Sequence, residues 1–255
     1  TLDGSENMQP DWVWSKARES LSIITGSHFL FDSVRGAGAE KELRSNVADA
    51  EGSSANQVYG YVSSFDSDGF TTTAGSSNND YFNKSSVKYV SWNWKAGGSA
   101  SSNSNGSITS SVSANTTAGF SIVSYTGTGS NATVGHGLGS APGWFVTKSR
   151  DTGTEGWMVF HQSLGATAGV RLNETANAAT VTAYFNNTAP TSSVFSIGTN
   201  DVVNKSGDKY IAYCFAEKKG YSKFGSYTAN GDADGTFVYT GFAPSFIIFK
   251  RTDSG

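Results

Sequence analysis

Hydrophobic and polar residues alternate along several short segments of the chain, and a period of two predicts β-strands. The alternation is clearest in residues 89–95, YVSWNWK, where Val90, Trp92 and Trp94 share one face. Residues 210–216, YIAYCFA, repeat the pattern. This pattern is typical of antiparallel strands with one face on the core and one face in solvent.

Three short apolar strands that end in lysine each follow a proline. They are PDWVWSK at residues 10–16, PGWFVTK at residues 142–148 and PSFIIFK at residues 244–250. A Ser-Tyr-Thr sequence precedes the second and third copies, and the step from Tyr125 to Tyr227 is 102 residues. Repetition at a fixed spacing predicts repeated structural units.

Other segments recur in the same order, including NKSSVKYV at residues 83–90 and NKSGDKYI at residues 204–211. The chain is therefore interpreted as part of a longer tandem array. The expected divisions are a first unit at 1–97 without its opening hairpin, a Gly/Ser/Asn-rich flexible linker at 98–118 with one possible edge strand, a second unit at 119–226, and residues 227–255 as the start of a third unit or as strands that complete a neighbouring sheet.

The composition supports an all-β fold of tandem antiparallel β-sandwich units. Charged residues make up 15% of the chain and aromatic residues 13%, and glycine occurs 30 times. Aromatic residues favour strands, glycine favours tight turns, and only ELRSNVADAE at residues 42–51 predicts a helical turn. The single cysteine, Cys214, excludes an internal disulfide framework, and the net charge of −3 argues against a nucleic-acid partner. The sequence contains no apolar run long enough to predict membrane insertion.

The ordered segments PDWVWSK, HFLFDSVRGAG, YVSWNWKAGG, GFSIVSYTGTGSNATVGHGLGSAP and FVYTGFAPSFIIFKR cover most of the chain. In this order they resemble a repeated domain of bacteriophage tail-fibre and other virion surface proteins, especially those of marine phages. The resemblance implies a lectin-like jelly-roll sandwich and a structural role on the virion surface. It also implies assembly in the host cytoplasm with other virion subunits, as a homo-oligomer that is a trimer or a fibre.

Aromatic side chains beside amide and carboxylate groups are typical of carbohydrate sites, because rings stack on sugar faces while polar groups bind hydroxyls. Such clusters occur near the loops of both expected units, although packing in the core is the alternative for each aromatic residue. The candidate glycan-binding residues are Tyr59, Tyr61, Asn78, Asn79, Asp80, Tyr81, Tyr184, Asn186 and Asn187, and Phe82 adjoins the first group.

Two acidic loops are candidate calcium sites, calcium being the only cofactor that the sequence suggests. Asn230, Asp232 and Asp234 place oxygen-bearing side chains at alternate positions, as the first half of a calcium loop does. No glutamate stands at the twelfth position of that loop, so a plain turn is the alternative. The second loop, with Asp66 and Asp68, has the same ambiguity.

No catalytic constellation emerges from His28, His136 and His161, and we expect a protein that is not an enzyme. The expected function is that of a virion surface or fibre protein with structural and host-attachment roles, attachment being to a glycan. One alternative is a purely architectural capsid or tail decoration protein. Another is a fibre-borne polysaccharide depolymerase, which would need paired carboxylates in a groove.

Overall fold

The computed structural model describes residues 7–18, 27–53, 56–77 and 81–253. Within these ranges the chain forms sixteen strands and three helices of four residues each. The strands of the two larger sheets and of the two smaller sheets pair antiparallel. The expectation of an all-β, antiparallel fold is therefore confirmed.

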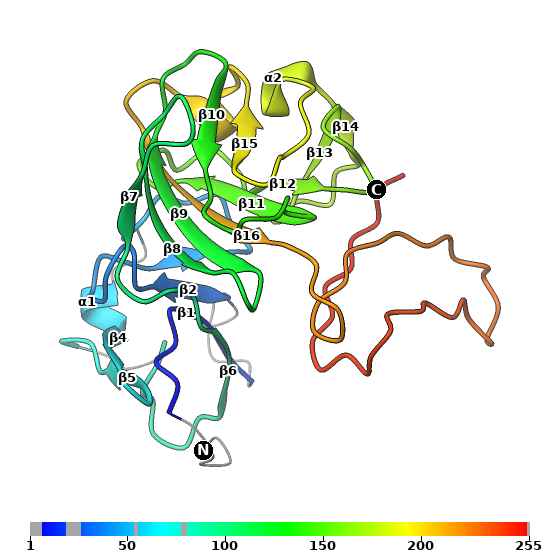
Figure 1. Ribbon diagram of the computed structural model, residues 1–255. Helices are drawn as coiled ribbons and strands as arrows, with labels where there is room; N and C mark the ends of the chain where they lie inside the picture. The colour runs from blue at the N-terminus through cyan, green and yellow to red at the C-terminus, as the bar shows by residue number, and fades with distance from the viewer. Residues whose placement is uncertain (1–6, 19–26, 54–55, 78–80, 254–255) are drawn as a thin grey trace.

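The strands form two main sheets and two smaller two-stranded sheets (Figure 1). The first sheet has the order β3 (Leu43–Arg44), β2 (Phe29–Asp32), β1 (Trp12–Ala17), β6 (Tyr89–Trp94). The second has the order β14 (Ala179–Thr180), β13 (Ala168–Arg171), β12 (Met158–His161), β11 (Trp144–Ser149), β16 (Lys209–Phe215), β9 (Phe120–Thr126), β8 (Ser110–Asn115), β7 (Ser101–Asn103). The two-stranded sheets are the hairpin of β4 (Tyr61–Asp66) and β5 (Gly69–Thr73) and the pair of β10 (Ala132–Gly135) and β15 (Val194–Ile197). The helices are α1 (Asn56–Tyr59), α2 (Thr182–Phe185) and α3 (Asp201–Asn204).

The two main sheets pack face to face through a layer rich in aromatic residues. The ring of Trp12 lies 4.4 Å from that of Tyr213 and 5.7 Å from that of Phe120, both of which belong to the second sheet. Trp14 is buried in the same cluster, which also contacts the partly buried Trp92 and Trp94. Trp92 and Trp94, which the alternation placed on one face of their strand, thus border the same core as Trp12 and Trp14.

Each main sheet is also covered on its outer face. Val13, Phe29 and Phe31 of the first sheet pack against the β4–β5 hairpin. On the second sheet, the outer face packs against β10, β15, α2 and α3. The molecule thus has four layers, with the two-stranded sheets outside and the main sheets inside (Figure 1).

This layering corrects the expectation of half-buried strands. In β16, Ile211 and Tyr213 face the first sheet, while Tyr210, Ala212 and Cys214 face the β10–β15 layer. All five side chains are fully buried. The alternation of large and small residues in this strand separates two cores, so neither of its faces lies in solvent.

The segment at residues 98–118 is not a flexible linker, which corrects a second expectation. Strands β7 and β8 lie within it, and β8 pairs with β9 from Ser111↔Ser124 to Asn115↔Phe120. The strand foreseen there is present as β8, but it lies between β9 and β7, so the edge strand is β7 instead. Its serine and asparagine side chains tolerate an exposed sheet edge, and Val112 is buried in the core.

Two further expectations of local structure need correction. Residues 42–51 contain the short strand β3 and turns instead of a helical turn. Residues 227–253 contain no strand, although residues 244–250 repeat the sequence pattern of β1 and β11. This C-terminal segment leaves the second sheet and loops away from the body before it returns (Figure 1).

The central strands of both sheets share one register. Trp12 lies opposite Trp94 on one side and Asp32 on the other. Its counterpart Trp144 lies opposite Phe215 and His161 in the same way. The strand orders β2-β1-β6 and β12-β11-β16 correspond as well.

A buried ionic network joins the two sheets beside their aromatic layer. Arg35 Nε lies 2.5 Å from Asp32 Oδ2, and Tyr213 donates a hydrogen bond of 2.7 Å to the same oxygen. Glu51 connects Arg35 to Arg150 through contacts of 2.9 and 2.7 Å. Burial alone would raise the pKa of Glu51, but the two arginines outweigh it and lower that pKa.

Removal of the central cation from this network tests how strongly it stabilises the fold. We expect Arg35→Met to reduce the free energy of unfolding by about 3–5 kcal/mol, because Asp32 would remain buried without its partner. Lys95→Met, at an exposed position, should change it by no more than about 0.5 kcal/mol. Urea unfolding measures both values, and equal stability of the two variants would contradict a structural role for the network.

Candidate functional site

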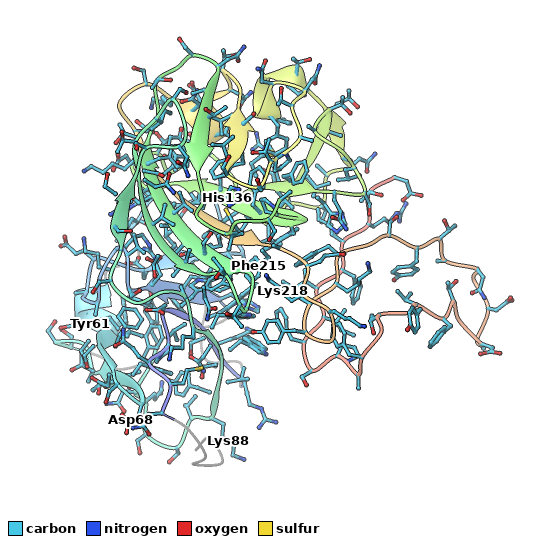
Figure 2. All side chains as sticks on the ribbon, viewed as in Figure 1. Tyr61, Asp68, Lys88, His136, Phe215 and Lys218 are labelled. Carbon is cyan, nitrogen blue, oxygen red and sulfur yellow. The ribbon has the colours of Figure 1, made fainter. Side chains whose placement is uncertain are left out.

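The first group of predicted glycan-binding residues belongs mainly to a core. Tyr59 stacks on Tyr81 with ring centres 4.9 Å apart, and Tyr81 is buried against Phe29. Phe82 is buried in the same cluster, and Tyr61 on β4 packs against its rim (Figure 2). Tyr81 therefore offers no free ring face for a sugar. The other predicted members, Asn78, Asn79 and Asp80, lie outside the described residues.

The second group lies on and after helix α2, where the chain turns sharply. Tyr184 is buried within the helix, and the next two predicted residues, Asn186 and Asn187, have φ angles of 52° and 46°. Asparagine tolerates this left-handed conformation better than most residues. Asn187 is exposed and donates a hydrogen bond of 3.3 Å to Thr182. The turn thus separates the inward ring of Tyr184 from the outward amide of Asn187.

Tyr184 lines a pocket of about 350 Å³ at the β13–β14 end of the second sheet. This volume is at the lower end of the range for small-molecule sites, about 300–1,000 Å³. The buried lining residues Met158, Gly169 and Tyr184 form a largely apolar floor, and the more exposed ones form a rim whose polar members are Arg171, Glu174 and Asn177. The remaining lining residues are Ala176 and Ala179.

An ion pair forms one wall of the pocket. Arg171 Nη1 lies 2.9 Å from Glu174 Oε1, and both side chains are partly exposed. Burial lowers the pKa of Arg171, but its hydrogen bond with Glu174 and the charge of that residue outweigh this effect and raise the pKa. The wall therefore presents a permanent cation and a carboxylate, which can hydrogen-bond to vicinal hydroxyl groups.

The glycine in the floor is required by close packing. A Cβ atom at Gly169 would lie 2.8 Å from the Met158 sulfur and 3.2 Å from the Phe185 ring. Because these neighbours belong to the core, a larger residue there would displace them. The chain thus keeps an apolar floor of defined depth beneath the polar rim.

The residues of this wall were not foreseen from the sequence, apart from Tyr184. Arg171 and Glu174 stand in the segment RLNETANAAT, where only a three-residue spacing of opposite charges marks them. Such spacing is common on solvated surfaces. Only the fold of β13 and its loop brings the pair to the ring of Tyr184.

A second surface groove, of about 390 Å³, crosses strands β7, β8, β9 and β16. Hydroxyl groups and two cations, Arg150 and Lys209, line it. Tyr125, its aromatic residue, is buried, and Arg150 is already paired with Glu51. The groove therefore offers hydroxyl groups and the ammonium of Lys209 but, unlike the Tyr184 pocket, no carboxylate.

The predicted calcium loop at residues 230–235 forms a plain Asx turn. Asp232 N donates a hydrogen bond of 3.1 Å to Asn230 Oδ1, which occupies one of the expected ligand atoms. In the other acidic loop, Thr71 donates a 2.7 Å hydrogen bond to Asp66. Across the described residues, no group of three or more His, Cys, Asp or Glu side chains is arranged to hold a metal ion. Calcium binding by Asn230, Asp232 and Asp234 stays a prediction.

One buried titratable group, Lys148, was not foreseen as unusual. Its Nζ atom donates hydrogen bonds to the carbonyl oxygens of Ser149 and Thr152, at 2.7 and 3.2 Å. Burial lowers its pKa to about 8, although Asp49, Glu155 and Asp208 act in the opposite direction. The repeated lysine at the end of each post-proline strand was the sequence signal. In this strand the ammonium group satisfies backbone carbonyls of the following turn.

The histidines stand in three separate environments. His136 directly follows β10 and is buried; its Nδ1 accepts from Leu138 N and its Nε2 lies 3.1 Å from Thr191 O (Figure 2). Burial lowers the pKa of His136, so its neutral form fits these two bonds. His28 accepts a hydrogen bond of 2.9 Å from the Trp14 indole. Both side chains have structural partners.

Comparisons with known proteins place the whole chain within one domain family. Among the described residues, no helix is long and apolar enough to span a membrane. No curated protein and no solved structure matches the chain. A family described as a domain of unknown function, DUF7483, matches residues 3–255. Because the match covers nearly the full length, the chain belongs to the DUF7483 family.

Proposed function

We propose that this protein is a non-enzymatic structural module of a bacteriophage virion surface or tail fibre. One observation carries the proposal: the four strands of the first sheet match four of the eight strands of the second in order, the central strands share one register, and the two sheets pack into one layered body. A body of two similar sheets, in which most of the reactive side chains described above are buried and paired, is what we expect of a protein that extends or decorates a particle. The sequence resemblance to phage fibre domains supports the same proposal.

We interpret the layers as two tandem sandwich units of the repeat identified in the sequence. Each unit comprises one main sheet and the two-stranded sheet that covers it. Residues 227–255 then begin a third unit or complete a neighbouring sheet. Matching hydrogen bonds support the repeat, since Lys84 N donates to the hydroxyl of Tyr89 and Lys205 N to that of Tyr210. The lectin-like jelly-roll classification comes from the sequence resemblance.

We propose further that the pocket beside Tyr184 attaches the particle to a glycan on the host surface. The Arg171–Glu174 pair, the amide of Asn177 and an apolar floor supply the chemistry that sugars use. The pocket has room for a terminal sugar unit and not for a long chain. The partners proposed are therefore other virion subunits in a homo-oligomer, and a host glycan.

A purely architectural protein is the second candidate. The burial of Tyr81 and Tyr184 favours it, because those aromatic residues stabilise the fold whether or not a ligand binds. A depolymerase has less support. Asp32, one of the acids of the first unit that such an enzyme could use, is bound to Arg35 and Tyr213, so its carboxylate is part of the buried network.

Detection in virions tests the structural role. We expect mass spectrometry of purified particles, from a phage that encodes this chain, to recover its peptides at a copy number typical of structural subunits. The peptides should stay with the particles through density-gradient purification, since a structural subunit is an integral part of the particle. Their presence in lysate but not in particles would contradict the proposal.

A glycan array tests the attachment role at the pocket. We expect a defined glycan to bind the wild-type chain and Arg171→Gln to weaken its binding at least about tenfold, equivalent to ~1.4 kcal/mol. Asn177→Ala should weaken it as well, because its amide lines the rim. The matched controls Lys219→Gln and Asn131→Ala, both at exposed positions elsewhere, should bind normally.

Two outcomes of the array would count against glycan attachment at this pocket. The first is an absence of binding by a chain shown to be folded, which would favour the architectural candidate. The second is binding that survives both pocket variants, which would place the site elsewhere. Parallel arrays with EDTA test the calcium prediction for Asn230, Asp232 and Asp234.

A further inference from the structure

Strand β6 has an open edge that its counterpart β16 does not have. The first sheet ends at β6, whereas β16 is flanked by β11 and β9. No strand within the described residues pairs with the outer edge of β6. An open edge of this kind is a template for an added strand.

The strand that covers β16 is held by contacts specific to the Ser-Tyr-Thr sequence. Tyr125 stacks on Tyr210 with ring centres 5.1 Å apart and an interplanar angle of 11°. The hydroxyl group of Tyr125 donates a hydrogen bond of 2.7 Å to Val203 O. Asn204 then fixes the turn that follows, because its Oδ1 accepts from Thr128 N at 2.7 Å.

The first sheet offers the matching receptor positions. Tyr89 has the same hydroxyl contact as Tyr210, with the backbone N–H five residues earlier. Tyr81 and Phe82 are buried just before Asn83, as Val202 and Val203 are before Asn204. The side chain of Asn204 is buried, whereas that of Asn83 is exposed. A Ser-Tyr-Thr strand would therefore meet a prepared surface on β6.

The chain carries a second Ser-Tyr-Thr segment, which is exposed and not part of any strand. Residues 225–243, here called the finger, contain Tyr227 at 55% exposure, Phe237 at 85% and Tyr239 at 78%. The ends of the finger are fixed to the body. Phe224 N donates to Glu217 at 3.0 Å, and Phe246 packs against Trp94 at 5.4 Å. Between these anchors the finger projects away from the molecule (Figure 1).

We propose that the finger of one copy adds a strand to the open edge of β6 in a second copy. The register of β9 on β16 specifies the pairing, since Lys209↔Thr126 and Tyr210↔Tyr125 correspond to Lys88↔Thr228 and Tyr89↔Tyr227. Donor and acceptor are different surfaces, so the contact is heterologous and builds a closed ring or an open head-to-tail filament. This inference goes beyond the proposed function, because it names the surface that joins copies and is independent of glycan binding.

A two-chain disulfide experiment tests this pairing directly. Lys88 (Figure 2) and Thr228 are both exposed, so a cysteine at either position leaves the folded body intact. The native Cys214 is buried and does not compete. A mixture of Lys88→Cys and Thr228→Cys chains should form a disulfide-linked heterodimer under mild oxidation. A mixture of Lys219→Cys and Thr228→Cys chains should remain at the background level.

Two results of the disulfide experiment would overturn the proposal. One is equal cross-linking in the two mixtures. The other is a Lys88→Cys/Thr228→Cys double variant that forms only an intrachain disulfide, while the mixture of single variants forms none. That pattern would mean that the finger closes on its own chain.

Light scattering of the full chain gives an independent readout. The wild-type mass should rise with concentration above the 26.8 kDa of one chain. Two separate variants are tested, Ser226→Pro and Tyr227→Pro. Both are needed because only alternate residues of an antiparallel strand donate a backbone hydrogen bond to a given neighbouring strand. At least one should return the mass to that of a single chain, with an unchanged melting temperature since both sites are exposed.

The matched control for these variants is Ala233→Pro, in the turn of the finger, which should associate like the wild type. A wild-type chain that stays a monomer at every concentration would contradict strand addition. An oligomer that is unaffected by both strand prolines would contradict it as well.

Discussion

The contact of Trp12 with Tyr213 and Phe120 is the interaction on which the rest of the structure depends, because it joins the two main sheets. Alternation along β1 aims Trp12 and Trp14 at the second sheet and Val13 at the opposite layer. Alternation along β16 likewise directs successive side chains into two different cores. The outer face of each main sheet is also apolar and is covered by a two-stranded sheet, which gives the body its four layers.

The reactive side chains of the interior are largely committed to this architecture. Arg35 neutralises Asp32, and Lys148 donates hydrogen bonds to backbone carbonyls. His136, in its neutral form, connects the end of β10 to the loop before β15. Such arrangements stabilise one packing of the layers. The partly exposed Arg171–Glu174 pair is different, because it lines a pocket whose polar rim is open to a ligand. This contrast is why we place attachment at that pocket and assign the remaining residues to structure.

Local sequence patterns predicted the strands and their faces, including the tryptophans of the central core, because a period of two is a local property. They failed where distant segments decide the environment. Tyr81 and Tyr184 pack inward because β4–β5 and α2 cover the sheets, and β16 is buried on both faces for the same reason. Residues 98–118 form strands despite their linker-like composition, since β9 offers a pairing edge. Arg171 and Glu174 belong to a pocket only after β13 and its loop have folded against α2.

Native-state hydrogen exchange tests the central claim, that the packed aromatic layer makes the two sheets one cooperative body. The measurement compares the opening free energies of backbone amides in β1 and β2 with those in β11 and β16. We predict equal values in both sheets, and equal losses in both when Trp12 is replaced by alanine. A first sheet that opens at a much lower free energy than the second, with β16 unaffected by that replacement, would contradict the account.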